Sequence, residues 1–161
     1  MRKILLVEDN LVELELIKEE LEAGDRYDVT FVSGIAYAEQ LLNENRENCF
    51  DCVIIDLNMS NRYLDEIYKG ITHGGTFTGW VWLFRIGKNL LANSPKIIIY
   101  SEFIDDLEDI IHESDDSDEI GYFNSATKIT KSEAVDGAEY LRTRVDELFG
   151  KCQKEQLQHA Y

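Results

Sequence analysis

Residues 50–59 read Phe-Asp-Cys-Val-Ile-Ile-Asp-Leu-Asn-Met, a short apolar run followed by an acid. The run 52–55 is apolar throughout, which is typical of a parallel strand covered on both faces. It stops at Asp56. Open α/β sheets bind their ligands beyond the carboxyl ends of the strands, and Asp56 would lie at such an end. The stretch therefore predicts a central strand with a candidate site beside it.

Four more runs have the character of strands, and segments with helical periodicity separate them. The expected strands are 3–7, 29–32, 96–100 and 120–123. Alternating strands and helices imply right-handed crossovers and a parallel sheet. We therefore expect an α/β protein with a flavodoxin-like, doubly wound sheet of five parallel strands, in the order 2-1-3-4-5, with helices on both faces.

Spacing and capping residues predict where the helices begin. Asn10 and Glu13 form a capping-box pair before a helix that Gly24 ends, and Thr130 and Glu133 form a similar pair before a long helix over 131–149. A third helix should bury a set of large apolar side chains, namely Trp80, Trp82, Leu83 and Ile86.

The chain has 161 residues, the usual size of one domain. We expect a single domain over 1–150 and a tail over 151–161. Residues 60–78 are far longer than an ordinary connection, so we expect an insert there that forms a flap near Asp56. Residues 102–119 are crowded with acids; their start should be helical and 114–118 a solvated loop.

Composition narrows the class of partner. The formal net charge of −16 argues against direct binding to nucleic acid, because each phosphate contact needs a cation. No apolar run reaches the roughly 20 residues that a membrane span needs, so no membrane insertion is expected. The three cysteines do not form a secreted disulfide framework, which favours the cytoplasm.

Acidic residues end two of the expected neighbouring strands. Glu8 and Asp9 follow the first strand, and Asp56 follows the third. Carboxylates that converge in this way repel one another unless a hard cation such as Mg²⁺ lies among them. A carboxylate beside Mg²⁺ can act as the nucleophile in phosphoryl transfer. Ser101 offers a hydroxyl after the fourth strand, and Lys128 a cation after the fifth.

The stretches 3–10 (Lys-Ile-Leu-Leu-Val-Glu-Asp-Asn), 50–59 and 95–101 (Pro-Lys-Ile-Ile-Ile-Tyr-Ser) resemble strands 1, 3 and 4 of response-regulator receiver domains. The resemblance covers roughly 1–59 and 79–149. It implies that Asp56 is the phosphoacceptor and that Mg²⁺ or Mn²⁺ is the cofactor.

The same resemblance implies the roles of the other site residues. Asp9 would bind the metal directly and Glu8 mainly through a water, while the backbone carbonyl of Asn58 would complete the metal site. Ser101 would be the switch hydroxyl, and Lys128 would bind the phosphoryl group.

The resemblance also implies a function. The chain would be a stand-alone, chemotaxis-regulator-like receiver of a two-component system. It would accept a phosphoryl group from a histidine kinase or a histidine phosphotransfer protein and signal through a partner protein or as a homodimer. It would be no enzyme apart from self-phosphorylation and dephosphorylation at Asp56.

Three departures from the family pattern keep alternatives open. Ser60 and Ile129 stand where the family usually has prolines, and Lys128 comes about three residues late, so Lys131 is a rival for its role. The aromatic residue that reports the switch is either Tyr122 or Phe123.

Two other functions compete with the signalling interpretation. The departures and the insert fit a receiver-like module that binds proteins independently of phosphorylation. An aspartate-dependent phosphohydrolase is less favoured, because such enzymes need a second acid two residues after the nucleophile and this chain has Asn58 there.

Overall fold

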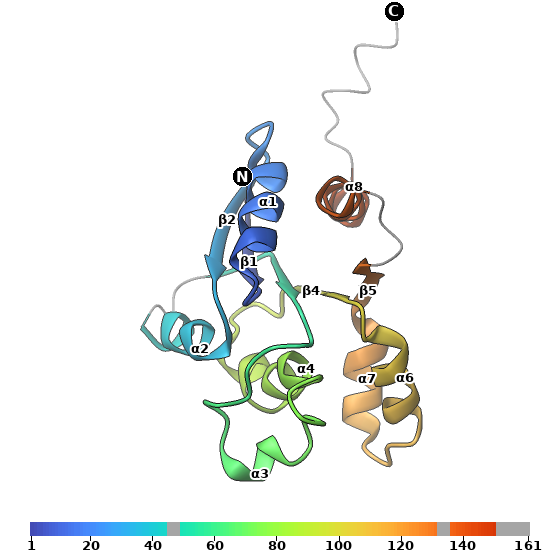
Figure 1. Ribbon diagram of the computed structural model, residues 1–161. Coiled ribbons are helices and arrows are strands. Elements are labelled where there is room, and N and C mark those ends of the chain that lie inside the picture. The colour runs from blue at the N-terminus through green and yellow to red at the C-terminus, as the bar shows by residue number, and fades with distance from the viewer. Residues whose placement is uncertain (45–48, 132–135, 151–161) are drawn as a thin grey trace, which may run out of the picture.

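The computed structural model describes residues 1–44, 49–131 and 136–150. Five strands form a single sheet (Figure 1), with the order β2-β1-β3-β4-β5 and every neighbouring pair parallel. The strands are β1 (Arg2–Val7), β2 (Tyr27–Val32), β3 (Cys52–Ile55), β4 (Lys96–Ser101) and β5 (Thr127–Thr130). The predicted fold class and strand order are confirmed.

The connections between strands carry the helices. These are α1 (Leu11–Glu22), α2 (Ile35–Glu44), α3 (Glu66–Lys69), α4 (Thr78–Trp82), the π-helical turn η1 (Leu83–Gly87), α5 (Lys88–Leu90), α6 (Ile104–His112), α7 (Ser117–Ser125) and α8 (Gly137–Phe149). Within the three described ranges, none of them is both long enough and apolar enough to cross a membrane.

The sheet buries both faces, and β3 shows why its sequence is continuously apolar. Val53 and Ile55 enter the core beneath α2, α4, α6 and α7, whereas Cys52 and Ile54 enter the core beneath α1 and α8. Successive side chains of a strand point to opposite faces, so a strand covered on both sides needs apolar residues at every position. This double coverage fixes β3 in the middle of the sheet and Asp56 at its end.

Helix α1 begins as its capping residue predicts. The Asn10 side chain accepts a hydrogen bond from the Glu13 amide at 3.4 Å, which satisfies one of the free amides of the first turn. The Glu13 carboxylate, expected to reach back toward Asn10, instead binds Lys131. Only one half of the predicted capping box is therefore formed.

The prediction of a fifth strand at 120–123 is wrong, because these residues lie in α7 and β5 follows at Thr127–Thr130. Asp116 caps α7 by accepting hydrogen bonds from the amides of Asp118 and Glu119. Phe123 is fully buried against the ring of Trp80. Ile120 and Phe123 lie three residues apart, a spacing that suits one face of a helix, and so short an apolar run does not distinguish a helix from the predicted strand. The predicted cap at Thr130 and Glu133 includes a residue outside the described ranges.

The two irregular segments have structure of their own. Residues 60–78 contain α3, and Asn61 Nδ2 donates a hydrogen bond to Oγ1 of the buried Thr72 at 2.9 Å, which ties the start of the insert to the segment after α3. Residues 104–112 form α6 as expected, but the following loop is shorter than predicted, since α7 already begins at Ser117.

The aromatic residues after the insert are buried as predicted. Trp80, Trp82 and Leu83 are each at most 1% exposed, whereas Ile86 is only partly buried. Trp80 stacks on Phe84 with ring centroids 5.9 Å apart and packs at 5.8 Å against Tyr122 of α7. Helix α4 is thereby fixed between the sheet and α7.

Candidate functional site

A cavity of about 250 Å³ lies where the carboxyl ends of β1, β3, β4 and β5 meet. Its lining contains five of the six site residues expected from the sequence (Glu8, Asp9, Asp56, Asn58 and Ser101), together with Asn10, Glu13, Glu102, Phe103 and Lys131. Lys128 is not in the lining. The parallel sheet brings these residues together because its strands all end at the same edge.

Asp56 is held firmly by its own backbone and that of its neighbours. Its amide donates to the carbonyl of Val7 at 3.1 Å, and its Oδ1 accepts from the Leu57 amide at 2.7 Å. A Cβ on Gly79 would stand 1.8 Å from the Asp56 carbonyl oxygen, so α4 approaches this carbonyl as only glycine permits. The side chain, 8% exposed as a residue, keeps its Oδ2 turned toward the cavity.

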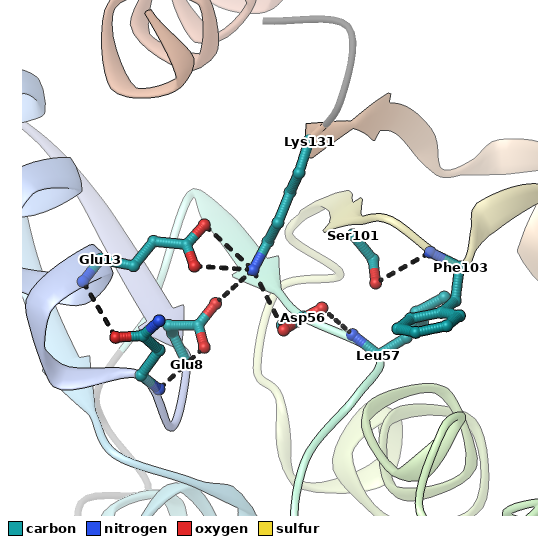
Figure 2. Close-up of polar contacts among 8 residues, drawn as sticks. Glu8, Glu13, Asp56, Leu57, Ser101, Phe103 and Lys131 are labelled. Atoms are coloured by element: carbon teal, nitrogen blue, oxygen red, sulfur yellow. Dashed lines mark hydrogen bonds and ion pairs between the residues drawn. The ribbon is translucent and has the colours of Figure 1, made fainter.

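Lys131 is the centre of the site. It reaches from the end of β5 into the space between Asp56 on one side and two glutamates on the other (Figure 2). Its Nζ lies 2.8 Å from Glu8 Oε2 and 3.0 Å from Glu13 Oε2. The third contact, to Asp56 Oδ2, measures 3.1 Å. One ammonium group therefore donates hydrogen bonds to three carboxylates.

Three acids around one base leave an excess of negative charge. Burial, followed by the charge of Asp56, raises the pKa of Glu8 from 4.5 to about 7, although the hydrogen bonds from Lys131 and Asn10 oppose this rise. Burial works to lower the pKa of Lys131, but the charge of Asp56 and the hydrogen bonds to the two glutamates outweigh it and raise this pKa. Lys131 is thus kept charged, while Glu8 is poorly compensated.

Lys128 lies elsewhere, because it is the second residue of β5 rather than a residue beyond it. Its Nζ donates to the carbonyl of Ala126 at 3.3 Å and sits 4.3 Å from the ring centroid of Phe123. Burial lowers the pKa of Lys128. The position just past β5 belongs to Lys131, so the structure brings the rival lysine to Asp56. Because the fifth strand was expected at 120–123, Lys128 was expected beyond its end, whereas the structure has it within β5.

Ser101 ends β4 and is fully buried. Its Oγ accepts a hydrogen bond from the Phe103 amide at 3.4 Å, so its own proton remains available for a group in the cavity. The two candidate switch aromatics are not on β5: Tyr122 and Phe123 both lie in α7 and contact Trp80. Ile129 occupies the strand between the two lysines.

Glu13 is the site residue that the sequence did not reveal. The sequence predicts only a capping role for it, yet it lies in the first turn of a helix that starts three residues after Glu8. The first turn of a helix that follows a strand directly lies over the end of that strand. This position was the available indication that Glu13 could reach the site.

The donor chemistry of the cavity suits a hard divalent cation. Five carboxylates line it (Glu8, Asp9, Glu13, Asp56 and Glu102) against the one cation of Lys131, and Mg²⁺ prefers oxygen ligands. Among the described residues, however, no three His, Cys, Asp or Glu side chains converge closely enough to hold a metal. The point where Glu8 and Asp56 converge is taken by the Lys131 ammonium.

The insert does not cover this cavity. No residue of 60–78 contributes to its lining. The insert leads into α4, and Gly79 at its end packs on the backbone of Asp56, with the Gly79 amide donating to the Leu57 carbonyl at 2.9 Å. The expected flap is therefore attached to the backbone beside Asp56 rather than laid over its carboxylate.

Solved structures with the same fold are receiver domains of response regulators. The receiver domain of the Francisella response regulator 1452 has a TM-score of 0.55 and 21% identity, over 93% of this chain and 100% of that one. The response regulator TrrA from Thermotoga maritima, in complex with Mg²⁺-BeF, gives 0.55 and 23% over 92% and 99%. The phosphorylated cyanobacterial phytochrome response regulator RcpA gives 0.52 and 21% over 91% and 92%.

No protein-family model matches the sequence, and no curated protein matches it significantly. At these identities the comparison establishes the fold alone. The chain has the receiver-domain fold over most of its length.

Proposed function

We propose that this protein is a phosphoacceptor: Asp56 takes a phosphoryl group from a phosphohistidine donor, with the assistance of Mg²⁺ or Mn²⁺. The observation that carries the proposal is the position of Asp56 Oδ2, which points into the cavity at 3.1 Å from the Lys131 ammonium. A carboxylate in a cavity beside a fixed cation is equipped to attack an anionic phosphorus centre, since the cation offsets the repulsion.

The transfer forms one bond and breaks one. A carboxylate oxygen of Asp56 attacks phosphorus in line with the leaving group, an O–P bond forms, and the bond from phosphorus to the histidine nitrogen breaks with its electron pair on nitrogen. The Leu57 amide donates to Oδ1 at 2.7 Å before transfer, which leaves Oδ2 as the oxygen facing the incoming phosphorus. The product is an acyl phosphate on Asp56.

Lys131 and Ser101 bind the new phosphoryl group. The Lys131 Nζ, at 3.1 Å from the Asp56 carboxylate before transfer, moves its hydrogen bond to a phosphoryl oxygen once that carboxylate loses its charge. The buried Ser101 hydroxyl donates to a second oxygen. Lys131 rather than Lys128 has this role, because Lys128 is engaged with the Phe123 ring.

Glu8, Asp9, Asp56 and the carbonyl of Asn58 would hold the metal. When bound, it supplies positive charge to the transferring phosphoryl oxygens and orients them. The protein contributes oxygen ligands and an excess of negative charge, which line the same cavity. TrrA, which shares the fold, binds Mg²⁺-BeF.

The proposed output is a change of partner binding. Phosphorylation would bias the ends of β4 and β5, because Ser101 and Lys131 lie there and both would turn toward the phosphoryl group. The donor would be a histidine kinase or a histidine phosphotransfer protein, and the receiver of the signal another protein.

The test is phosphorylation by acetyl phosphate in Mg²⁺, followed by intact-protein mass spectrometry. The wild-type protein should gain one phosphoryl group that maps to Asp56, and Asp56→Asn should gain none. Chelation of the metal should abolish the gain. A folded wild-type protein that stays unmodified would contradict the proposal and would favour a module that binds partners independently of phosphorylation.

A further inference from the structure

We propose that Glu13 restrains the switch by competing with the phosphoryl group for Lys131. The inference rests on the proposed function, and it assigns a regulatory role within the site to a residue of α1. Glu13 is a positioning residue in this account, because it acts on the phosphoryl group through Lys131.

The first step is that Lys131 has no donor to spare. An ammonium group has three N–H bonds, and the three carboxylate contacts at 2.8, 3.0 and 3.1 Å use all of them. The Lys131 side chain is only 14% exposed, so water has little access to it. A phosphoryl group can therefore receive only the N–H bond that Asp56 gives up, unless Glu8 or Glu13 also yields its contact.

The second step is that Glu13 is well fixed as a competitor. Its amide donates a hydrogen bond to the Asn10 side chain at 3.4 Å, and the next residue of α1, Leu14, is fully buried in the core. The Glu13 side chain is 26% exposed. A partly buried, charge-assisted contact of this kind is stronger than a surface ion pair.

The third step concerns what phosphorylation changes. It removes the charge of the Asp56 carboxylate, so that contact with Lys131 is given up without resistance. Glu8 and Glu13 keep their contacts, and they continue to draw on the positive charge that would stabilise the phosphoryl group. Glu8 is also an expected metal ligand, whereas the role proposed for Glu13 is confined to Lys131.

Removal of this competitor should strengthen anion binding at Asp56. Glu13→Gln keeps the size of the side chain and abolishes its charge. We expect the variant to bind beryllofluoride, in Mg²⁺, about three- to tenfold more tightly than the wild type, a range set by the strength of a partly buried ion pair. Glu15→Gln, which removes an exposed acid from the same helix, should bind within about twofold of the wild type because its charge is screened.

A double-mutant cycle separates competition from direct repulsion. If Glu13 acts through Lys131, Glu13→Gln should have no effect in a Lys131→Met background. Titrations followed by tryptophan fluorescence or ¹⁹F NMR would give the four affinities. An unchanged or weaker affinity in Glu13→Gln would overturn the inference, and so would an equal gain with and without Lys131.

The same titrations distinguish the two levels of the proposal. A wild-type protein that does not bind beryllofluoride at all would contradict the phosphoacceptor function itself. A wild-type protein that binds it, with Glu13→Gln and Glu15→Gln both equal to it, would leave that function standing and exclude the role of Glu13.

Discussion

Two clusters meet at Asp56 and differ in what holds them together. The acidic cluster (Glu8, Glu13, Asp56 and Lys131) faces the side chain of Asp56, and it is short of positive charge. The aromatic cluster (Trp80, Phe84, Tyr122 and Phe123) belongs to the helices beyond Gly79, which covers the backbone of Asp56.

The comparison suggests a division of roles within one site, in which the aromatic cluster stabilises the fold and the acidic cluster carries the proposed function. The aromatic cluster should respond to changes of size, because its rings are packed in contact. The acidic cluster should respond to changes of charge, because its contacts are ionic and its acids are under-compensated. Substitutions on either side of Asp56 can test whether this division holds.

The largest expected effect is on the aromatic side. Trp80 is 1% exposed and its Nε1 donates to Glu119 at 2.9 Å, so Trp80→Ala would lose a large buried ring and a hydrogen bond. We expect the free energy of unfolding to fall by about 3–5 kcal/mol, measured by urea denaturation. Tyr37→Ala, at a side chain 59% exposed, should change it by less than about 0.5 kcal/mol. Similar values for the two variants would break the comparison.

A slightly smaller effect is expected from a single methyl group. Gly79→Ala would place a Cβ 1.8 Å from the Asp56 carbonyl oxygen, so α4 must move and unfolding should become easier by about 3 kcal/mol. Beryllofluoride binding should weaken as well, because the backbone of Asp56 would shift.

Gly121→Ala is the matched control for Gly79→Ala. Gly121 lies inside α7 with nothing within 4 Å of an added Cβ, and alanine is the better helix former. We expect it to stabilise the protein by about 0.5–1 kcal/mol in the same denaturation experiment. If the two glycine variants were alike, close packing against Asp56 would not be the reason for Gly79.

On the acidic side, stability should depend on the charge of Glu8. The pKa of Glu8 in the folded protein is about 7, above the ordinary 4.5, so the folded state holds this proton more tightly than the unfolded state does. The resulting contribution to stability is fully present below about pH 4.5 and is lost as the pH rises through 7. Between pH 5 and 8 the wild type should lose about 2–3 kcal/mol more than Glu8→Gln, since each pKa unit corresponds to about 1.4 kcal/mol. If the free energy of unfolding depended on pH in the same way in the two proteins, the pKa of Glu8 would not be raised in the folded state.

The last comparison is between the two lysines and is read by ligand binding rather than by stability. Lys131→Met should weaken beryllofluoride binding by about tenfold or more, the value of a charge-assisted hydrogen bond. Lys128→Met should leave it within about twofold, because Lys128 Nζ lies against Phe123 and makes no contact with the acidic cluster. A reversed order would restore Lys128 as the phosphoryl-binding residue.

The first half of the fold could be predicted almost completely from the sequence. β1 and β3 are apolar runs that stop at acids, and a strand covered on both faces has no other pattern. Parallel strands end at one edge of the sheet, and the expected flavodoxin-like order places β1 beside β3, so the meeting of Glu8, Asp9 and Asp56 was also predictable. The structure confirms the strand order and brings these acids to one cavity.

The second half was less predictable because a helix and a strand competed for the same short apolar run. Ile120 and Phe123 fit either, and only the Asp116 cap and the contact with Trp80 decide for the helix. The contact between Phe123 and Trp80 joins residues far apart in the sequence, so the local sequence does not reveal it. Because the strand was expected too early, Lys128 was expected beyond its end, where the structure has Lys131.

The structure of the protein crystallised with Mg²⁺ and beryllofluoride would test the central claim most directly. The account predicts beryllium bound to Asp56 Oδ2, with Lys131 Nζ and the Ser101 hydroxyl both contacting fluorine atoms. A structure in which Asp56 stays bare while Lys131 keeps all three carboxylates, under conditions where the ligands are saturating, would contradict it.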